Sequence, residues 1–267
     1  MRSCFLSVGL CRYELQGVSP CGGKASSFAR SAFVCHMMGM FVYFHIFSFL
    51  IWVNIREQKV EREREKQYVE SMVADMKEDT GKIKKSIVYC TTQVAAFDSL
   101  LRNIYHTPYT DSSLKMMYYL QRRYTGNKET VAFTKRTITQ LKNSGGLRLI
   151  RNKAASDSII IYSETCETTE FQADYFVNVR LGKVNDFAIQ LFDNQYLLNY
   201  DRNTIRDILR TNSKIALLNN DEKLIKEYAN TINHAKATLA NYIRMLKDME
   251  SRIPEVVKFL EHEYHLE

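Results

Sequence analysis

A row of acidic residues is the most regular cluster of chemically capable side chains in this sequence. Glu164, Glu167, Glu170 and Asp174 recur at intervals of three and four, so on a helix they share one face. Helical bundles hold pairs of metal ions with such carboxylates when Glu-x-x-His pairs face them. No histidine lies in this stretch, so we expect a solvated helix face and no metal.

Two of the six cysteines, Cys90 and Cys166, lie in the charged part of the chain, and both fall on apolar stripes. A disulfide requires Cα atoms within about 7 Å of each other. A rise of about 1.5 Å per residue along the expected helices places the two cysteines at levels that differ by roughly 10 Å. We therefore expect two small core hydrophobes. The absence of C-x-x-C pairs argues against zinc-ribbon and thioredoxin-type sites.

The histidines and glycines also fail to form a recognisable site. His36 and His45 could serve a proton relay or a haem, but their spacing points them in different directions on a helix. His262 and His265 lack the H-E-x-x-H spacing of a zinc site. The Gly-Gly pair at residues 145–146 has no following Lys-Ser or Lys-Thr. We expect no catalytic, cofactor or metal residues, and no enzyme activity.

The feature that positions the rest of the chain is an apolar stretch at residues 31–55, which contains no Asp, Glu, Lys or Arg. A membrane-spanning helix needs about 20 mostly apolar residues. Trp52 lies near the end of the stretch, where an indole ring suits the headgroup region. The sequence therefore predicts a single transmembrane helix with the lipid bilayer as its partner.

The flanks of this helix leave two questions open. Residues 1–30 are rich in Cys, Ser and Gly without periodicity, and we expect a disordered or spurious leader, with Met37, Met38 or Met40 as alternative starts. Lys and Arg are more frequent just after the helix than just before it, which favours a cytoplasmic C-terminal side. Large domains are nevertheless translocated despite such a bias.

From residue 56 onward the pattern is helical. A segment of alternating charges at residues 56–66 leads into heptads that end before Pro108. The expected a positions are Val69, Met76, Ile83, Cys90, Phe97 and Ile104, and the expected d positions are Val73, Thr80, Ile87, Val94 and Leu101. A second helix begins near Asp111, is interrupted at residues 125–127, resumes near Lys128 and stops at the glycines 145–146.

Two further long helices follow. Ser156 or Asp157 is expected to cap the third, whose apolar spacing changes around residues 173–181 as in a coiled-coil stutter. A linker at residues 199–220 contains a short helix at 204–210. The fourth helix has Ile225, Ile232, Leu239 and Leu246 on its stripe, and Pro254 is expected to begin a final short helix.

These elements predict an all-α chain, with an N-terminal transmembrane helix that continues into an antiparallel, coiled-coil-like four-helix bundle. The scarcity of Pro and Gly agrees with long helices. The expected divisions are a leader at 1–30, a transmembrane helix at 31–55, a bundle at 56–252 and a short C-terminal helix at 253–267. Exchange of helices between chains is a second way to bury the seams, as a homo-oligomer or with a protein partner.

Three segments resemble an uncharacterised bacterial family of single-pass membrane proteins with one N-terminal membrane helix and a helical body. They are WVNI at residues 52–55, EKQYVESMVADM at 65–76 and QLKNSGGLRLI at 140–150, within about residues 50–165. The resemblance implies a body outside the cytoplasmic membrane, on the periplasmic side, and no known catalytic residue. The long leader with its cysteines departs from that family.

The net charge of +7 is spread over interspersed charges of both signs, without the basic stripe that nucleic-acid binding requires. Strong apolar seams without reactive constellations favour a membrane-anchored interaction or scaffold protein. The alternative is a ligand-sensing bundle outside the cytoplasm, similar in layout to the sensor domains of chemoreceptors.

Overall fold

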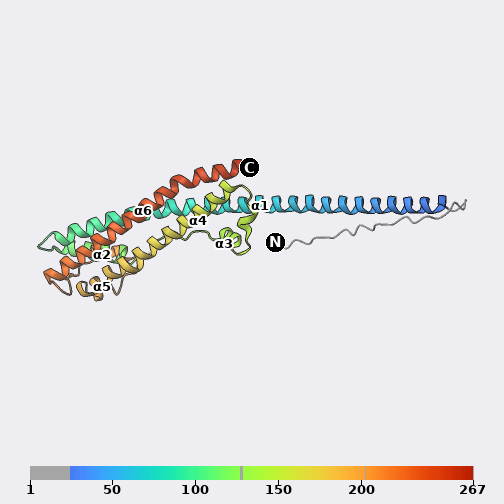
Figure 1. Cartoon of the computed structure of the whole chain (residues 1–267). Helices are drawn as coiled ribbons and strands as arrows, with labels where there is room; N and C mark the ends of the chain where they lie inside the picture. Colours follow the sequence, from blue (N-terminus) through green and yellow to red (C-terminus); the bar gives the residue numbers. More distant parts are fainter. Residues whose placement is uncertain (1–24, 127–128, 202, 267) are drawn as a thin grey trace. The chain divides into compact units, whose positions relative to one another are not determined.

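The computed structural model describes residues 25–126, 129–201 and 203–266, which form six α-helices and no strand (Figure 1). The expectation of an all-α chain is confirmed. The chain divides into two compact units, residues 1–59 and residues 60–267, and we call the second unit the body. The longest helix, α1 (Ala25–Tyr105), contains residues of both units.

In the first unit, α1 contains a long exposed apolar stretch. Every residue from 36 to 59 is exposed, including all large apolar side chains from Met37 to Ile55. Among the described helices, α1 alone is long and apolar enough to cross a membrane. Most of the expected leader, residues 1–24, lies outside the described residues. Residues 25–30 belong to α1, which corrects the expected disorder, because no Pro or Gly interrupts the helix there.

In the body, α1 buries a stripe that differs from the expected seam by one residue. All six expected a positions are buried, as predicted. The expected d positions Thr80, Ile87 and Val94 are only half-buried. The residue before each of them, Asp79, Ser86 and Gln93, is buried instead. The other two expected d positions, Val73 and Leu101, are buried as predicted. The d register is therefore wrong only in the middle of the seam, where polar residues occupy the buried positions and other parts of the body supply their partners.

The second helical region is shorter than expected. Helix α2 (Asp111–Tyr124) begins with a capping box in which the Thr110 side chain accepts from the Ser113 amide. The expected resumption at Lys128 is wrong, since residues 129–135 are not helical and α3 (Arg136–Asn143) begins only after them. Val131 and Phe133 are buried while Ala132 is exposed, an alternation typical of extended chain. We call residues 129–135 the non-helical segment.

The predicted stop at the two glycines is confirmed. Gly145 has φ of 67°, in the left-handed region that glycine adopts without strain, and a 3₁₀ turn (Gly146–Leu149) follows. Helix α4 (Lys153–Asp174) then begins earlier than expected. Its cap is Asn152, whose side chain accepts from the Ala155 amide, and not Ser156 or Asp157. Asn152 has the extended backbone that an N-cap requires.

A π-helix, η2 (Tyr175–Leu181), joins α4 to α5 (Gly182–Leu191). It lies where the apolar spacing changes in the sequence. A π-helix has a wider turn than an α-helix, so it absorbs an irregular step in the buried stripe. Phe176, Val177 and Leu181 remain buried through this segment.

A 3₁₀ helix, η3 (Asn194–Leu197), precedes the expected linker at 199–220. The linker itself contains a second 3₁₀ helix, η4 (Ile205–Arg210), near the predicted position. Helix α6 (Glu222–Tyr264) continues through Pro254. The prediction of a separate short helix at 253–267 is therefore wrong. Ile253, Val257 and Leu260 extend the buried stripe of α6, and their packing offsets the lost backbone hydrogen bond at Pro254.

Helix α6 packs against α4 and α5, and α4 and α6 lie side by side in Figure 1. Ion pairs connect α6 to the body part of α1. Lys77 Nζ lies 2.7 Å from Glu261 Oε1, and Lys236 pairs with Asp98.

Candidate functional site

A row of buried polar side chains follows α1 through the body. Asp75 and Asp79 are fully buried, and Ser86 and Gln93 are 7% and 1% exposed. We call these four residues the polar row. Burying such groups costs free energy unless they find hydrogen-bond partners. The expectation of strong apolar seams is therefore wrong for this face of α1.

The partners of the polar row lie in and beside the non-helical segment. Asp79 accepts from the Thr134 amide at 2.9 Å and from the Thr134 hydroxyl at 2.8 Å. Asp75 accepts from the Thr137 amide at 3.2 Å, near the start of α3. Ser86 donates to the Glu129 carbonyl at 3.2 Å. Side chains of α1 thus satisfy backbone groups that a helix would satisfy internally.

Further contacts hold the non-helical segment and the residues on either side of it. Gln93 Nε2 donates to the Tyr124 carbonyl at the end of α2, at 2.5 Å. Arg136 Nη2 lies 2.5 Å from Asp75 Oδ1. From the opposite side, the hydroxyl of Tyr242 on α6 accepts from the Val131 amide at 2.9 Å. Hydrogen bonds from both sides therefore hold the non-helical segment between α1 and α6.

A small pocket of about 200 Å³ lies beside this network, lined in part by Thr134, Lys135, Tyr162 and Cys166. The Tyr162 hydroxyl donates to Asp79 Oδ2 at 2.6 Å. Burial raises the pKa of the Cys166 thiol to about 12 and raises that of the Tyr162 hydroxyl further. A thiol that stays protonated is a poor nucleophile, so the pocket has no activated group of this kind.

The acidic row of α4 lies on the surface, and part of it forms ion pairs. Lys142 Nζ lies 2.8 Å from Glu167 Oε1, and Lys135 pairs with Glu170. Glu164 and Asp174 are exposed. No group of three His, Cys, Asp or Glu among the described residues could hold a metal ion.

Cys90 and Cys166 are both free and buried. Cys90 Sγ lies 3.8 Å from Ser86 Oγ, and burial raises the pKa of its thiol to about 11. Each cysteine thus lies on a packed stripe beside the polar row, as the expectation of small core residues requires.

The four histidines considered above lie far from this network in the sequence and are exposed. His45 contacts the rings of Phe41 and Phe44 on α1, with centroids 5.5 and 6.4 Å away. His265 adopts the left-handed conformation just beyond the end of α6. None of them has a neighbouring set of metal ligands within the described part of the chain.

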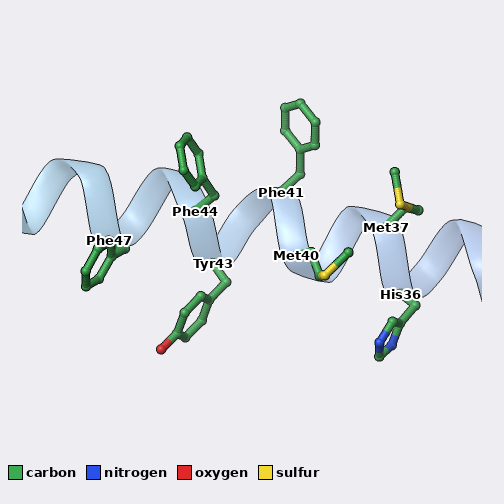
Figure 2. Close-up of a pocket in the computed structure, with 8 residues that line it drawn as sticks. His36, Met37, Met40, Phe41, Tyr43, Phe44 and Phe47 are labelled. Atoms are coloured by element: carbon green, nitrogen blue, oxygen red, sulfur yellow. The ribbon is translucent and has the colours of Figure 1, made fainter.

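A hollow of about 720 Å³ runs along α1 near His36. Figure 2 shows its side chains leaving one helix in opposite directions, with Met37, Phe41 and Phe44 on one side and Tyr43 and Phe47 on the other. A surface bounded by one helix alone does not enclose a ligand. The hollow is therefore part of the exposed apolar surface of the one described helix that is long and apolar enough to cross a membrane.

A second hollow of about 570 Å³ lies in the body, where α1 ends. We call it the Pro108 pocket. Its apolar lining comes from Ile104, Tyr105, Pro108, Leu114, Leu217 and Ile225. Its volume lies in the range of small-molecule sites, about 300–1,000 Å³. The lining residues come from five segments: the end of α1, the following turn, α2, the loop before α6 and the first turns of α6.

The Pro108 pocket also has a polar edge, formed by Thr107, Asn220, Glu222 and Lys226. Lys226 Nζ lies 2.5 Å from Glu222 Oε1, one helical turn away, and both side chains are exposed. Their hydrogen bond lowers the pKa of Glu222 and raises that of Lys226, so both are charged near neutral pH. The edge therefore presents one negative and one positive group side by side.

Neither the polar row nor the Pro108 pocket was predicted from the sequence. The pocket joins residues from distant segments, so local spacing contains no signal for it. The polar row did leave a signal, since Asp79, Ser86 and Gln93 recur every seven residues between Met72 and Leu100. Because these residues are polar, the sequence did not reveal that they are more deeply buried than the expected d positions Thr80, Ile87 and Val94 beside them.

Comparison of the chain with protein-family models, curated proteins and solved structures found no match.

Proposed function

We propose that this chain is a membrane-anchored helical protein whose body binds other proteins or a second copy of itself. One observation carries the anchor: every residue from 36 to 55 is exposed, and the apolar side chains drawn in Figure 2 leave the helix on opposite sides. A helix that is apolar all round needs an apolar environment on all sides. Arg56 lies 5.4 Å over the Trp52 ring, a pairing suited to the headgroup region.

Membrane extraction tests the anchor. The full chain should remain in the membrane pellet at alkaline carbonate and dissolve only in detergent. Phe44→Arg places a charge at the middle of the stretch, at a cost of about 2.5–3.5 kcal/mol on the insertion scale, and should shift the chain toward the soluble fraction. Ser71→Arg, at an exposed position of the body, is the matched control and should leave the fractionation unchanged. Release of the unmodified chain by carbonate would overturn the anchor.

We further propose that the body is an antiparallel four-helix bundle on the periplasmic side, in which α2, the non-helical segment and α3 together occupy one position. Reversed pairings along α1 support this layout. They are Gln93 with Tyr124, Ser86 with Glu129, Asp79 with Thr134 and Asp75 with Thr137. Reporter fusions at the C-terminus would test the side of the membrane, and a reporter active only in the cytoplasm would reject the periplasmic placement.

Association is tested by purification in mild detergent. A stoichiometric partner or a homo-oligomer, measured by light scattering and cross-linking, is the expected result. Exposed apolar side chains on the body offer contact points, among them Phe171 at 72% and Leu198 at 81% exposure. A monomer without a partner at all detergent concentrations would contradict this function.

The second candidate function is ligand sensing, favoured by the Pro108 pocket. An apolar hollow with a few polar groups at its edge is the usual form of a small-molecule site. Along α1, Ile104 lies about 66 Å from the start of the body at Val60, at 1.5 Å per residue. A ligand there would act at one end of the helices that form the body, and a shift in partner retention on ligand addition would test it.

A further inference from the structure

We propose that the Pro108 pocket binds a small zwitterion with an apolar body, of the class of aromatic or branched aliphatic amino acids. This inference rests on the second proposed function, ligand sensing, and does not depend on the membrane anchor. It is carried by the shape of the pocket and by the pair of opposite charges at its edge.

The apolar part of the pocket sets the body of the ligand. Ile104 is buried, while Leu114 and Ile225 are half-buried and turn part of their surface to the hollow. Tyr109 also lines the pocket, and its hydroxyl already donates to the Ile104 carbonyl at 2.9 Å. The side chain therefore offers a ligand its aromatic ring. A phenyl or branched aliphatic group placed here would lose water on several sides, and removal of apolar area from water favours binding.

The charged edge sets the head of the ligand. A ligand with only a carboxylate would meet Glu222 beside Lys226, and a ligand with only an ammonium would meet Lys226 beside Glu222. A zwitterion instead sets its carboxylate beside Lys226 and its ammonium beside Glu222. One ion pair is then replaced by two, so both charges of the edge stay partnered. Thr107 and Asn220 offer further hydrogen-bonding groups at the same edge.

The test is calorimetric titration of the full chain in detergent micelles with three probes that share one phenyl group: L-phenylalanine, 3-phenylpropionate and 2-phenylethylamine. We expect saturable binding of L-phenylalanine with a Kd of about 1 mM or tighter. Both single-charge probes should bind at least tenfold more weakly. Absence of L-phenylalanine binding, or equal binding of all three probes, would overturn the proposal.

Variants then assign the binding to this pocket. Glu222→Gln and Lys226→Gln should each weaken L-phenylalanine binding severalfold. Ala216 also lines the pocket, and Ala216→Phe should fill the hollow and abolish binding. Asp248→Asn and Arg252→Gln alter an exposed pair with the same spacing on α6, outside the pocket, and should leave the affinity unchanged. The two charge variants keep the test decisive if Ala216→Phe does not fold. Binding that survives all three pocket variants would place the ligand elsewhere and reject the proposal.

The outcome is distinguishable from failure of ligand sensing. If L-phenylalanine binds in the pocket but partner retention and oligomeric state do not respond, the site stands and sensing is rejected. If alkaline carbonate releases the chain from the membrane while L-phenylalanine binding persists, the anchor is rejected and the site stands.

Discussion

The hydroxyl of Tyr162 on α4 donates a 2.6 Å hydrogen bond to Oδ2 of Asp79 on α1. The same carboxylate accepts from the amide and hydroxyl of Thr134, and Lys82 Nζ lies 3.1 Å from its Oδ1. One buried acid therefore connects α1, α4 and the non-helical segment. Ion pairs and hydrogen bonds of this kind are costly to break on one side, because the remaining donors stay buried without an acceptor.

Removal of this acceptor should strongly destabilise the body. Asp79→Ala is expected to lower the free energy of unfolding by about 3 kcal/mol or more, since several donors lose their partner at once. The measurement is urea unfolding of the detergent-solubilised chain, followed by far-UV circular dichroism. Glu78→Ala removes the neighbouring exposed acid and should move the midpoint far less. Equal shifts for the two variants would show that Asp79 has no special structural role.

Two buried tyrosines on α6 provide a matched comparison. Tyr242 accepts from the Val131 amide, whereas the buried hydroxyl of Tyr228 has no hydrogen-bond partner among the described residues. Tyr242→Phe should therefore cost about 1–2 kcal/mol, because a buried amide loses its acceptor. Tyr228→Phe removes an unsatisfied polar atom and should be neutral or stabilising. Thermal unfolding of both variants decides the matter, and a reversed order of stability would contradict the assignment of these contacts.

Three features could be predicted from the sequence: the a stripe of α1, the end of α1 before Pro108 and the glycine stop at residue 145. Apolar spacing, proline chemistry and glycine freedom act within a few residues, so local sequence contains them. The non-helical segment could not be predicted. Val131, Thr134, Ile138 and Leu141 have helical spacing. Only Ile138 and Leu141 lie in a helix, because the backbone amides of Val131 and Thr134 are bonded to distant acceptors, Tyr242 on α6 and Asp79 on α1.

Alkaline pH should weaken the fold through the buried thiols. Burial raises the pKa of Cys90 to about 11 and that of Cys166 to about 12, from an ordinary value of 9.0. A raised pKa in the folded state means that the unfolded chain releases these protons first. The stability that the protonated thiols contribute is thus complete below pH 9 and is lost as the pH rises toward 12. Each thiol adds a slope of at most about 1.4 kcal/mol per pH unit.

The measurement is the urea midpoint as a function of pH between about 8 and 11. A Cys90→Ala, Cys166→Ala double variant should show a shallower decline than the unmodified chain. Part of the decline should persist, since burial also raises the pKa of Tyr118 to about 12. Parallel curves for the two proteins would exclude the thiols as the source.

Pro254 should be a point where stability can be gained. It lies inside α6, where its ring removes a backbone donor and crowds the preceding turn at a typical cost of about 3 kcal/mol. Pro254→Ala is expected to raise the free energy of unfolding by about 1–3 kcal/mol. Lys258→Ala, one turn later and also exposed, serves as the control and should have little effect. A loss of stability on replacement would mean that the body uses the local distortion that Pro254 imposes.

Amide hydrogen exchange would give an unusual map of this protein. The amides of Val131 and Thr134 lie outside any helix, yet they are bonded to the side chains of Tyr242 and Asp79. Their exchange must wait until those side chains release them, so slow exchange at residues 131 and 134 would report separation of whole helices. A segment without regular structure would then be among the last to lose protection.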